Sequence, residues 1–277
     1  MISGYAFSAC ENVSTVQLPD SMVKIDAFSF DNCVNLRQVL IPEGVTTIGQ
    51  YAFHWCPKLE EIFMPDSVVS VENHAFSYCK SLQYVKLSSG LKQLSNSVFS
   101  DCLSLSSIEI PQSIESINNY AFQHCSALQS VTIPASVTFL GSGAFEGCTS
   151  LEELTIENPA CRIVDETKTI SPTAKICGAV VSTAQIYAQK YERAFLPTNG
   201  TRGDVNLDGS ITLADAYDTL MISSYLALGM RDSPTNVELY TADYNRDGEI
   251  TISDAYDILM YTSMVAILRP PSDMMTE

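Results

Sequence analysis

Two twelve-residue segments near the C-terminus gather the oxygen-bearing side chains that a calcium ion prefers. Both follow the spacing D-x-N-x-D-G and have an acid at position 12. Positions 1, 3, 5 and 12 supply side-chain oxygens, position 7 supplies a backbone carbonyl, and glycine at position 6 permits the sharp turn. We therefore predict two bound Ca²⁺ ions, with ligands from Asp204, Asn206, Asp208, Ser210 and Asp215 in the first loop and from Asp243, Asn245, Asp247, Glu249 and Asp254 in the second.

The residues around these loops predict a helix after each loop but none before the first. Both loops run into the sequence D-A-Y-D-x-L-M, which begins at Asp215 and again at Asp254. Residues 197–203, before the first loop, contain proline and glycine and show no apolar period. Each copy is therefore a loop followed by a helix. This duplicated loop-helix resembles the type I dockerin module of cellulosomal proteins, over about residues 202–271.

The resemblance implies a small all-α module that binds a cohesin module of a scaffoldin, a role in assembly and not in catalysis. Each loop brings several carboxylates together, and their mutual repulsion opposes closure of the loop without metal. Metal binding should then contribute to the folding free energy of the module. We expect this part of the chain to be largely disordered in chelator and folded in calcium.

Helical spacing separates an inner face from an outer face in each copy. Apolar positions repeated three and four residues apart are expected inside: Ala216, Thr219 and Leu220, with Ala255, Ile258 and Leu259. Positions 10, 11, 14, 15 and 18 point the other way, and the resemblance implies that 10, 11 and 18 contribute much of cohesin recognition. The expected cohesin-binding residues are Leu213, Ala214, Tyr217, Asp218 and Met221 in the first copy, and Ile252, Ser253, Tyr256, Asp257 and Met260 in the second.

Two features of this outer face bear on specificity. Many family members have Ser-Thr at positions 10 and 11 and basic residues at 17 and 18, whereas this chain is more apolar there, which leaves its cohesin class open. Met221 and Met260 could instead fill the core of the module. Because the two copies are so alike, a half-turn would present nearly the same face, and the resemblance implies a dual binding mode.

Before residue 163 the sequence repeats every 23 residues. Cysteine recurs at positions 10, 33, 56, 79, 102, 125 and 148, and phenylalanine stands three residues earlier each time. One unit cannot bury its apolar side chains alone, so neighbouring units must stack into a solenoid. Residues 36–42 alternate and predict a short strand, which would pair in parallel with its counterparts. The A-F-x-x-C segment predicts a turn or 3₁₀ piece on the opposite side.

This period, with its cysteine and its isoleucine-proline step, resembles the BspA-like branch of leucine-rich repeats, common in bacterial surface proteins. The resemblance covers about residues 2–196 and implies an α/β solenoid without implying a ligand. We expect a solenoid over 1–162, a cap over 163–196, a linker over 197–202, the dockerin over 203–271 and a tail over 272–277. A helix at 184–193 should cover the last unit with Ile186, Tyr187 and Tyr191.

The cysteine column predicts buried free thiols. Side chains at one ladder position stack about 4.8 Å apart, whereas a disulfide prefers about 3.8 Å between its Cβ atoms. The remaining pair, Cys161 and Cys177, lies outside the period and could form a disulfide in the cap. No CxxC pair or Cys/His cluster occurs, so a zinc site is not expected.

Composition and motifs argue against several classes of function. His54, His74 and His124 have no partner at a catalytic spacing, no nucleophile motif occurs, and no enzyme activity is expected of this chain. The net charge of −17 disfavours nucleic acid and anionic membranes as partners. No apolar run reaches 18 residues, so no membrane span is expected. The repeat begins at once without a signal peptide, so we expect a fragment of a longer protein, extracellular in a cellulosome or at a bacterial cell surface.

One part of the strand face could bind a second partner. Leu40, Phe63 and Tyr84 are apolar residues at variable strand positions in three successive units, and together they could contact a protein or glycan. Scattered exposed apolar residues would give the same pattern. Two other functions therefore stay open: a surface adhesin that acts through the repeats, or part of a larger enzyme whose catalytic module lies upstream.

Overall fold

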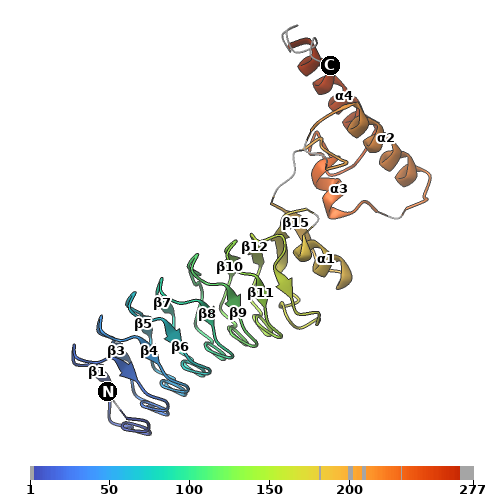
Figure 1. Cartoon of the computed structure of the whole chain (residues 1–277). Helices are drawn as coiled ribbons and strands as arrows, with labels where there is room; N and C mark the ends of the chain where they lie inside the picture. Colours follow the sequence, from blue (N-terminus) through green and yellow to red (C-terminus); the bar gives the residue numbers. More distant parts are fainter. Residues whose placement is uncertain (1–2, 181, 199–201, 208–209, 232, 269–277) are drawn as a thin grey trace. The chain divides into compact units, whose positions relative to one another are not determined.

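The computed structural model describes residues 3–180, 182–198, 202–207, 210–231 and 233–268 (Figure 1). The chain divides into two compact units, Met1–Ala194 and Phe195–Glu277. The first is a solenoid of short parallel strands and turns, and the second contains α-helices. Both fold classes predicted from the sequence are confirmed. No helix in the described part of the chain is long and apolar enough to cross a bilayer.

The solenoid has a main row, or ladder, of parallel strands, in which most paired residues are 23 positions apart, such as Val16 and Val39. In the second unit only Gln38–Leu40 of the predicted segment forms strand. Figure 1 shows these strands stacked in chain order, coloured from blue to yellow. They are β1 (Thr15–Gln17), β3 (Gln38–Leu40), β5 (Glu61–Phe63), β7 (Tyr84–Lys86), β10 (Ser130–Ile133), β12 (Glu153–Ile156) and β14 (Lys175–Gly178). They pair in three groups, β1 with β3, β5 with β7, and β10 with β12 and β14. The paired residues of β12 and β14 are 22 positions apart.

A second ladder, which the sequence pattern did not predict, consists of two-residue strands. Each ends in a buried aliphatic residue in the first six cases, such as Ile48 or Leu94. Two residues are too few to show an alternating pattern in the sequence. The strands are β2 (Lys24–Ile25), β4 (Thr47–Ile48), β6 (Ser70–Val71), β8 (Gln93–Leu94), β9 (Ser116–Ile117), β11 (Phe139–Leu140) and β13 (Arg162–Ile163).

The core is built from columns of identical residues. In the phenylalanine column, the residues from Phe30 to Phe145 are fully buried and stack on one another, with 5.2 Å between the centroids of Phe30 and Phe53, whereas Phe7 in the first unit is exposed. The cysteine column lies beside them, and all nine cysteines are free thiols, so Cys161 and Cys177 are not bonded to each other. The prediction of buried free thiols is confirmed for Cys33 to Cys148, while Cys10 at the first unit is half-buried.

The A-F-x-x-C segments form the turns that join the two ladders. Each turn contains two residues with positive φ, four positions apart, such as Tyr51 (φ 56°) and Trp55 (φ 55°). In the seventh unit both positions are glycine, Gly143 and Gly147. A left-handed conformation is unfavourable for residues with a Cβ atom, so the stacked hydrogen bonds between units must hold it, as when Phe30 N donates to Ala52 O at 2.8 Å.

Helix α1 (Thr183–Lys190) follows the last strands of the solenoid. Ser182 caps it, since its side chain accepts a hydrogen bond from Gln185 N at 3.2 Å. Its buried residues are Ala184, Tyr187 and Ala188. The predicted inner position of Ile186 was wrong: this side chain is 61% exposed, because the buried stripe runs through the two alanines instead.

The second unit contains α2 (Leu213–Ala227), α3 (Asn236–Thr241) and α4 (Ile252–Leu268), after the short strand β15 (Phe195–Pro197). Helices α2 and α4 are the predicted helices that follow the two loops, and they pack against each other. The structure adds α3, a short helix before the second loop. Thr235 and Glu238 form a capping box at its start, with Glu238 N donating to Thr235 Oγ1 at 3.2 Å.

Candidate functional site

The first loop folds around the carboxylate at position 12. Asp215 is fully buried, and its Oδ1 accepts hydrogen bonds from Val205 N at 2.7 Å and Asn206 N at 3.1 Å. Its Oδ2 accepts from Thr212 N at 2.8 Å, and Thr212 is also the N-cap of α2. The same aspartate therefore closes the loop and caps the helix that follows it. Asp204 is buried as well, whereas Asn206 and Ser210 are exposed.

The second loop repeats this arrangement, and here the carboxylates at both position 12 and position 1 accept backbone hydrogen bonds. Asp254 Oδ1 accepts from Asn245 N at 3.2 Å, and Oδ2 accepts from Thr251 N at 2.9 Å. The carboxylate of Asp243, at position 1, accepts from Asp247 N at 3.1 Å and from Gly248 N at 3.1 Å. Gly248 has φ +89°, the left-handed conformation that the sharp turn at position 6 requires.

These loops suit a hard cation. At both loops, the carboxylates at positions 1 and 12 are buried, a placement that costs free energy unless donors or a cation compensate it. All the donor groups are oxygens of the kind that Ca²⁺ binds. Among the residues that the structure describes, no group of three or more His, Cys, Asp and Glu side chains lies close enough to hold a metal. Asp208, a predicted ligand, lies outside the described residues.

Helices α2 and α4 present corresponding residues on their exposed faces. The residues at loop position 10, Leu213 and Ile252, are exposed, as are the tyrosines at position 14, Tyr217 and Tyr256. The predicted residues at position 11, Ala214 and Ser253, are exposed too, and those at position 15, Asp218 and Asp257, are half-buried. At position 18, Met260 is exposed and Met221 half-buried, so neither is fully enclosed in a core.

An apolar groove of about 430 Å³ lies between the two helices. The pairs at positions 10, 13, 14 and 17 of the two copies line it: Leu213 and Ile252, Ala216 and Ala255, Tyr217 and Tyr256, Leu220 and Leu259. The structure thus brings four of the predicted cohesin-binding residues together, at positions 10 and 14. Those at positions 11, 15 and 18 do not line the groove.

The two leucines at position 17 correct the prediction of the inner face. Ala216 and Thr219, with Ala255 and Ile258, are buried as expected, but Leu220 is 38% and Leu259 39% exposed. Small alanines at position 13 leave a furrow between the helices, and the leucines line its wall instead of closing the core. The matched apolar type at position 17 in both copies was the signal that could have revealed them.

On the solenoid, all three residues of the predicted apolar patch are exposed. The rings of Phe63 and Tyr84 are in contact, with their centroids 5.4 Å apart and tilted by 44°. Leu40 belongs to β3, in the unit before that of Phe63. Leu40 and Phe63 occupy one strand column and Tyr84 the other, so the two rings meet diagonally across β5 and β7.

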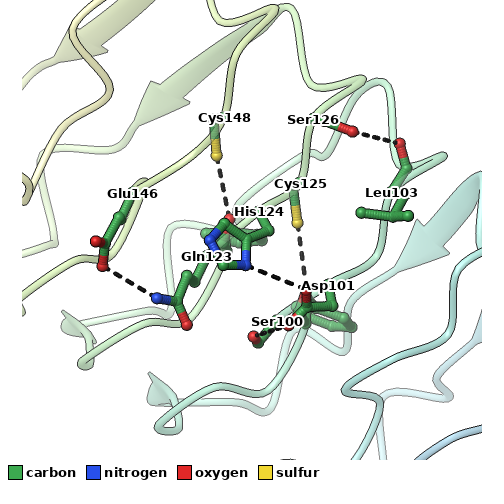
Figure 2. Close-up of polar contacts among 11 residues, drawn as sticks. Ser100, Asp101, Leu103, Gln123, His124, Cys125, Ser126, Glu146 and Cys148 are labelled. Atoms are coloured by element: carbon green, nitrogen blue, oxygen red, sulfur yellow. Dashed lines mark hydrogen bonds and ion pairs between the residues drawn. The ribbon is translucent and has the colours of Figure 1, made fainter.

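Two histidines of the turns have carboxylate partners one unit away. His54 Nδ1 lies 2.7 Å from Asp31 Oδ1, and His124 Nδ1 lies 3.1 Å from Asp101 Oδ1. Figure 2 shows that Ser100 and His124 both approach Asp101, since Ser100 Oγ donates to Asp101 Oδ2 at 2.9 Å. The carboxylate stands between serine and histidine, whereas a catalytic triad requires the histidine in the middle. These residues join neighbouring units.

The chain matches two protein families. Residues 1–102 and 46–167 match the family described as BspA type Leucine rich repeat region, in six copies, and residues 202–261 match the Dockerin type I domain. Type I dockerins are calcium-binding, cohesin-binding modules, and neither matched family is a catalytic one. Both are typical of extracellular or surface proteins. No curated protein matches the chain.

Solved structures of other leucine-rich repeat proteins resemble the solenoid. The T. pallidum leucine-rich repeat protein is 30% identical, with a TM-score of 0.51 over 66% of this chain and 85% of that protein. A leucine-rich repeat protein from Bacteroides ovatus is 27% identical, with a TM-score of 0.44 over 64% of this chain and 58% of that protein. This chain thus spans less than two thirds of the Bacteroides ovatus protein.

The 23-residue columns of the solenoid and the paired loop-helices of the second unit fit these two matches. The repeat match alone extends over more than half of the chain. The chain belongs to the BspA-type leucine-rich repeat family and has a type I dockerin domain C-terminal to its repeats.

Proposed function

We propose that this chain is a non-catalytic component of a cellulosome-type assembly, which docks onto a cohesin module of a scaffoldin outside the cell. The dockerin would attach the chain, and the repeats would present a recognition surface. The observation that supports docking best is the apolar groove between α2 and α4, lined by equivalent residues of the two copies. An exposed apolar groove on an acidic module is typical of an interaction site.

Calcium would order this surface without touching the partner. One Ca²⁺ in each loop would be held by the carboxylates at positions 1 and 12, with the oxygens at positions 3, 5 and 7, and would neutralise their repulsion. Asp215 and Asp254 link metal to helix, because each accepts from the threonine at position 9 near the start of its helix. Binding of calcium at the loops would therefore fix the N-terminal ends of α2 and α4, where Leu213 and Ile252 enter the groove.

The test is calorimetric titration of the whole chain against a panel of cohesin modules, in millimolar calcium and again in excess chelator. We expect tight binding to one class of cohesin in calcium and none in chelator. Leu220→Asp places a charge in the groove and should weaken binding at least about a hundredfold. Leu228→Asp is the matched control, because Leu228 is an exposed leucine that does not line the groove.

Binding in chelator that equals binding in calcium would contradict the calcium-dependent role. If no cohesin binds although calcium does, the loops serve only to stabilise the fold, and the docking proposal fails.

A further inference from the structure

The main strand ladder has no pairing between β3 and β5, and at the fifth unit, the one that contains Phe99, it has no strand at all. Residues 107–110 occupy the position of the strand there but pair with neither β7 nor β10. A hydrogen bond at the start of the strand position joins neighbouring units elsewhere in the ladder, as when Gln83 N donates to Glu60 O at 2.9 Å and Gln129 N to Ser106 O at 3.2 Å. Within this fully described stretch, the corresponding bond from Ser106 N to Gln83 O is missing.

The same two units stay joined in the turns. In the second ladder β8 pairs with β9, with Gln93 opposite Ser116, but not with β6. Phe76 N donates to Val98 O at 3.0 Å, and Tyr78 N donates to Ser100 O at 2.8 Å. The turns therefore hold the fourth and fifth units together, while neither strand ladder pairs them and the strand face opens between them.

Two further observations mark this junction. Ser67 Oγ and Ser136 Oγ each donate at 2.7 Å to a carbonyl of the unit before, but Ser113 Oγ, their counterpart in the fifth unit, is buried without a hydrogen-bond partner among the described residues. The phenylalanine stack also widens here. The centroid of Phe99 lies 5.7 Å from that of Phe76 and 5.8 Å from that of Phe122, against 5.2 or 5.3 Å elsewhere in the column.

The opening forms a cleft of about 500 Å³ between β7 and residues 107–110. This volume is in the range of small-ligand sites, about 300–1,000 Å³. The exposed ring of Tyr84 stands at the cleft and touches Phe63 outside it. Beside four apolar residues, its lining includes an aromatic ring, two carboxylates, one ammonium and two serine hydroxyls, from Tyr84, Asp66, Glu109, Lys86, Ser89 and Ser107.

The polar groups of the cleft are arranged to accept and donate hydrogen bonds at neutral pH. Ser89 N donates to Asp66 Oδ1 at 3.1 Å, and hydrogen bonds from the backbone and side chain of Ser89 lower the pKa of the Asp66 carboxyl. Asp66 is therefore an ionised acceptor, and Lys86 adds a donor to the lining. Backbone groups of residues 84–87 and 106–110 that face the opening add further donors and acceptors, because no backbone hydrogen bond crosses it.

We propose that this cleft binds a neutral oligosaccharide. A sugar ring has one apolar face, which would lie on Tyr84, and hydroxyls that both donate and accept, which suit Asp66, Lys86 and Glu109. Two carboxylates against one ammonium disfavour an anionic glycan or a phosphate group. The cleft is small compared with a standard protein–protein interface, which favours a saccharide over a folded protein.

The proposal is tested by titration calorimetry of the full chain, in calcium, with cello-, xylo-, manno-, chito- and maltohexaose as probes. We expect one series to bind and Tyr84→Ala to weaken that binding at least about tenfold. Glu109→Gln should weaken it as well, because the carboxylate loses its strength as an acceptor without a change of shape. The matched control is Glu153→Gln, an exposed carboxylate of β12 on the same strand face that does not line the cleft.

Circular dichroism and thermal unfolding of each variant would show that the solenoid is intact, which is expected because Tyr84 and Glu109 are exposed. The proposal is overturned if none of the five hexasaccharides binds. It is also overturned if Tyr84→Ala and Glu109→Gln bind as well as the wild type, or if Glu153→Gln weakens binding as much as Glu109→Gln. Cohesin binding plays no part in these outcomes, so they leave the docking proposal untouched.

Discussion

The thiol of Cys79 donates a hydrogen bond to the carbonyl of Phe53, 26 residues earlier, at an Sγ–O distance of 3.2 Å. The same bond recurs in every unit from Cys33 to Cys148, at distances from 3.0 to 3.3 Å. Figure 2 shows two members of this series, Cys125 and Cys148. The cysteine therefore has a specific task, since it satisfies a buried backbone acceptor while filling the space of a small apolar residue.

Removal of one thiol donor should destabilise the solenoid. Cys79→Ala leaves the carbonyl of Phe53 without its partner, at a cost of about 1–3 kcal/mol in the free energy of unfolding. Cys79→Ser keeps a donor at the same place and should lose less. Urea denaturation of the three proteins measures both values. Equal stability of Cys79→Ala and wild type would show that the hydrogen bond contributes nothing.

The thiol column also predicts a dependence of stability on alkaline pH. Burial raises the pKa of Cys79 from its ordinary 9.0 to about 12. Above pH 9 the unfolded chain loses this proton while the folded chain keeps it. The contribution of the thiol to the free energy of unfolding is therefore fully present below pH 9 and is lost as the pH rises toward 12. Cys79→Ser has no thiol to titrate there and should show a shallower decline. Parallel pH profiles for the two proteins would refute this cause.

The solenoid could be predicted from the sequence because its columns are strict. Phe and Cys recur at one spacing without insertion, and a repeat unit with a continuous apolar side has to stack. The two-residue strands were missed because Thr47–Ile48 is too short to show a pattern. The open junction was missed for another reason: residues 106–110 keep the apolar positions of the repeat, and the unit's position on the strand face is set by hydrogen bonds that sequence does not display.

The candidate docking site was predicted in part. The loop spacing located the residues at positions 10 and 14, since a helix must expose them on one side. Leu220 and Leu259 were assigned to the core because apolar residues at helical spacing usually lie there. Whether such a leucine is covered depends on the distance between α2 and α4, and the small Ala216 and Ala255 leave a groove there.

The left-handed turns predict a stabilising substitution. Ser97 has φ 53° and stands in the column that ends in Gly143. Ser97→Gly removes the Cβ atom that disfavours this conformation and should raise the free energy of unfolding by about 1 kcal/mol. Ser104 lies in the same unit but does not have a positive φ. Ser104→Gly should therefore lower the free energy of unfolding, because glycine gives the unfolded chain more conformational freedom. Denaturant unfolding compares the two; a loss of stability in Ser97→Gly would contradict the account.

Neutralising the acid at position 12 should abolish calcium binding at that loop. Asp254→Asn keeps the size of the side chain but removes the charge that a Ca²⁺ ligand supplies. We expect one ion fewer per chain by calorimetric titration and lower helicity of the second unit in calcium. Asp257→Asn, three residues further along α4, is the control and should leave calcium binding unchanged. Full calcium stoichiometry in Asp254→Asn would exclude this aspartate as a ligand.

The internal duplication predicts that the groove serves both orientations of a bound cohesin, whereas the two flanks of the groove exchange roles between them. A half-turn about an axis between α2 and α4 maps each groove residue onto its counterpart, and it exchanges Ala214 with Ser253, which are exposed outside the groove. If cohesin binds in either orientation, Ala214→Arg or Ser253→Arg alone blocks one of them and lowers affinity by no more than about threefold. The double variant blocks both and should lose at least about a hundredfold. Leu220→Asp, in the shared groove, should weaken binding in either orientation. A large loss from Ala214→Arg alone, with none from Ser253→Arg, would establish a single orientation in which α2 meets the cohesin.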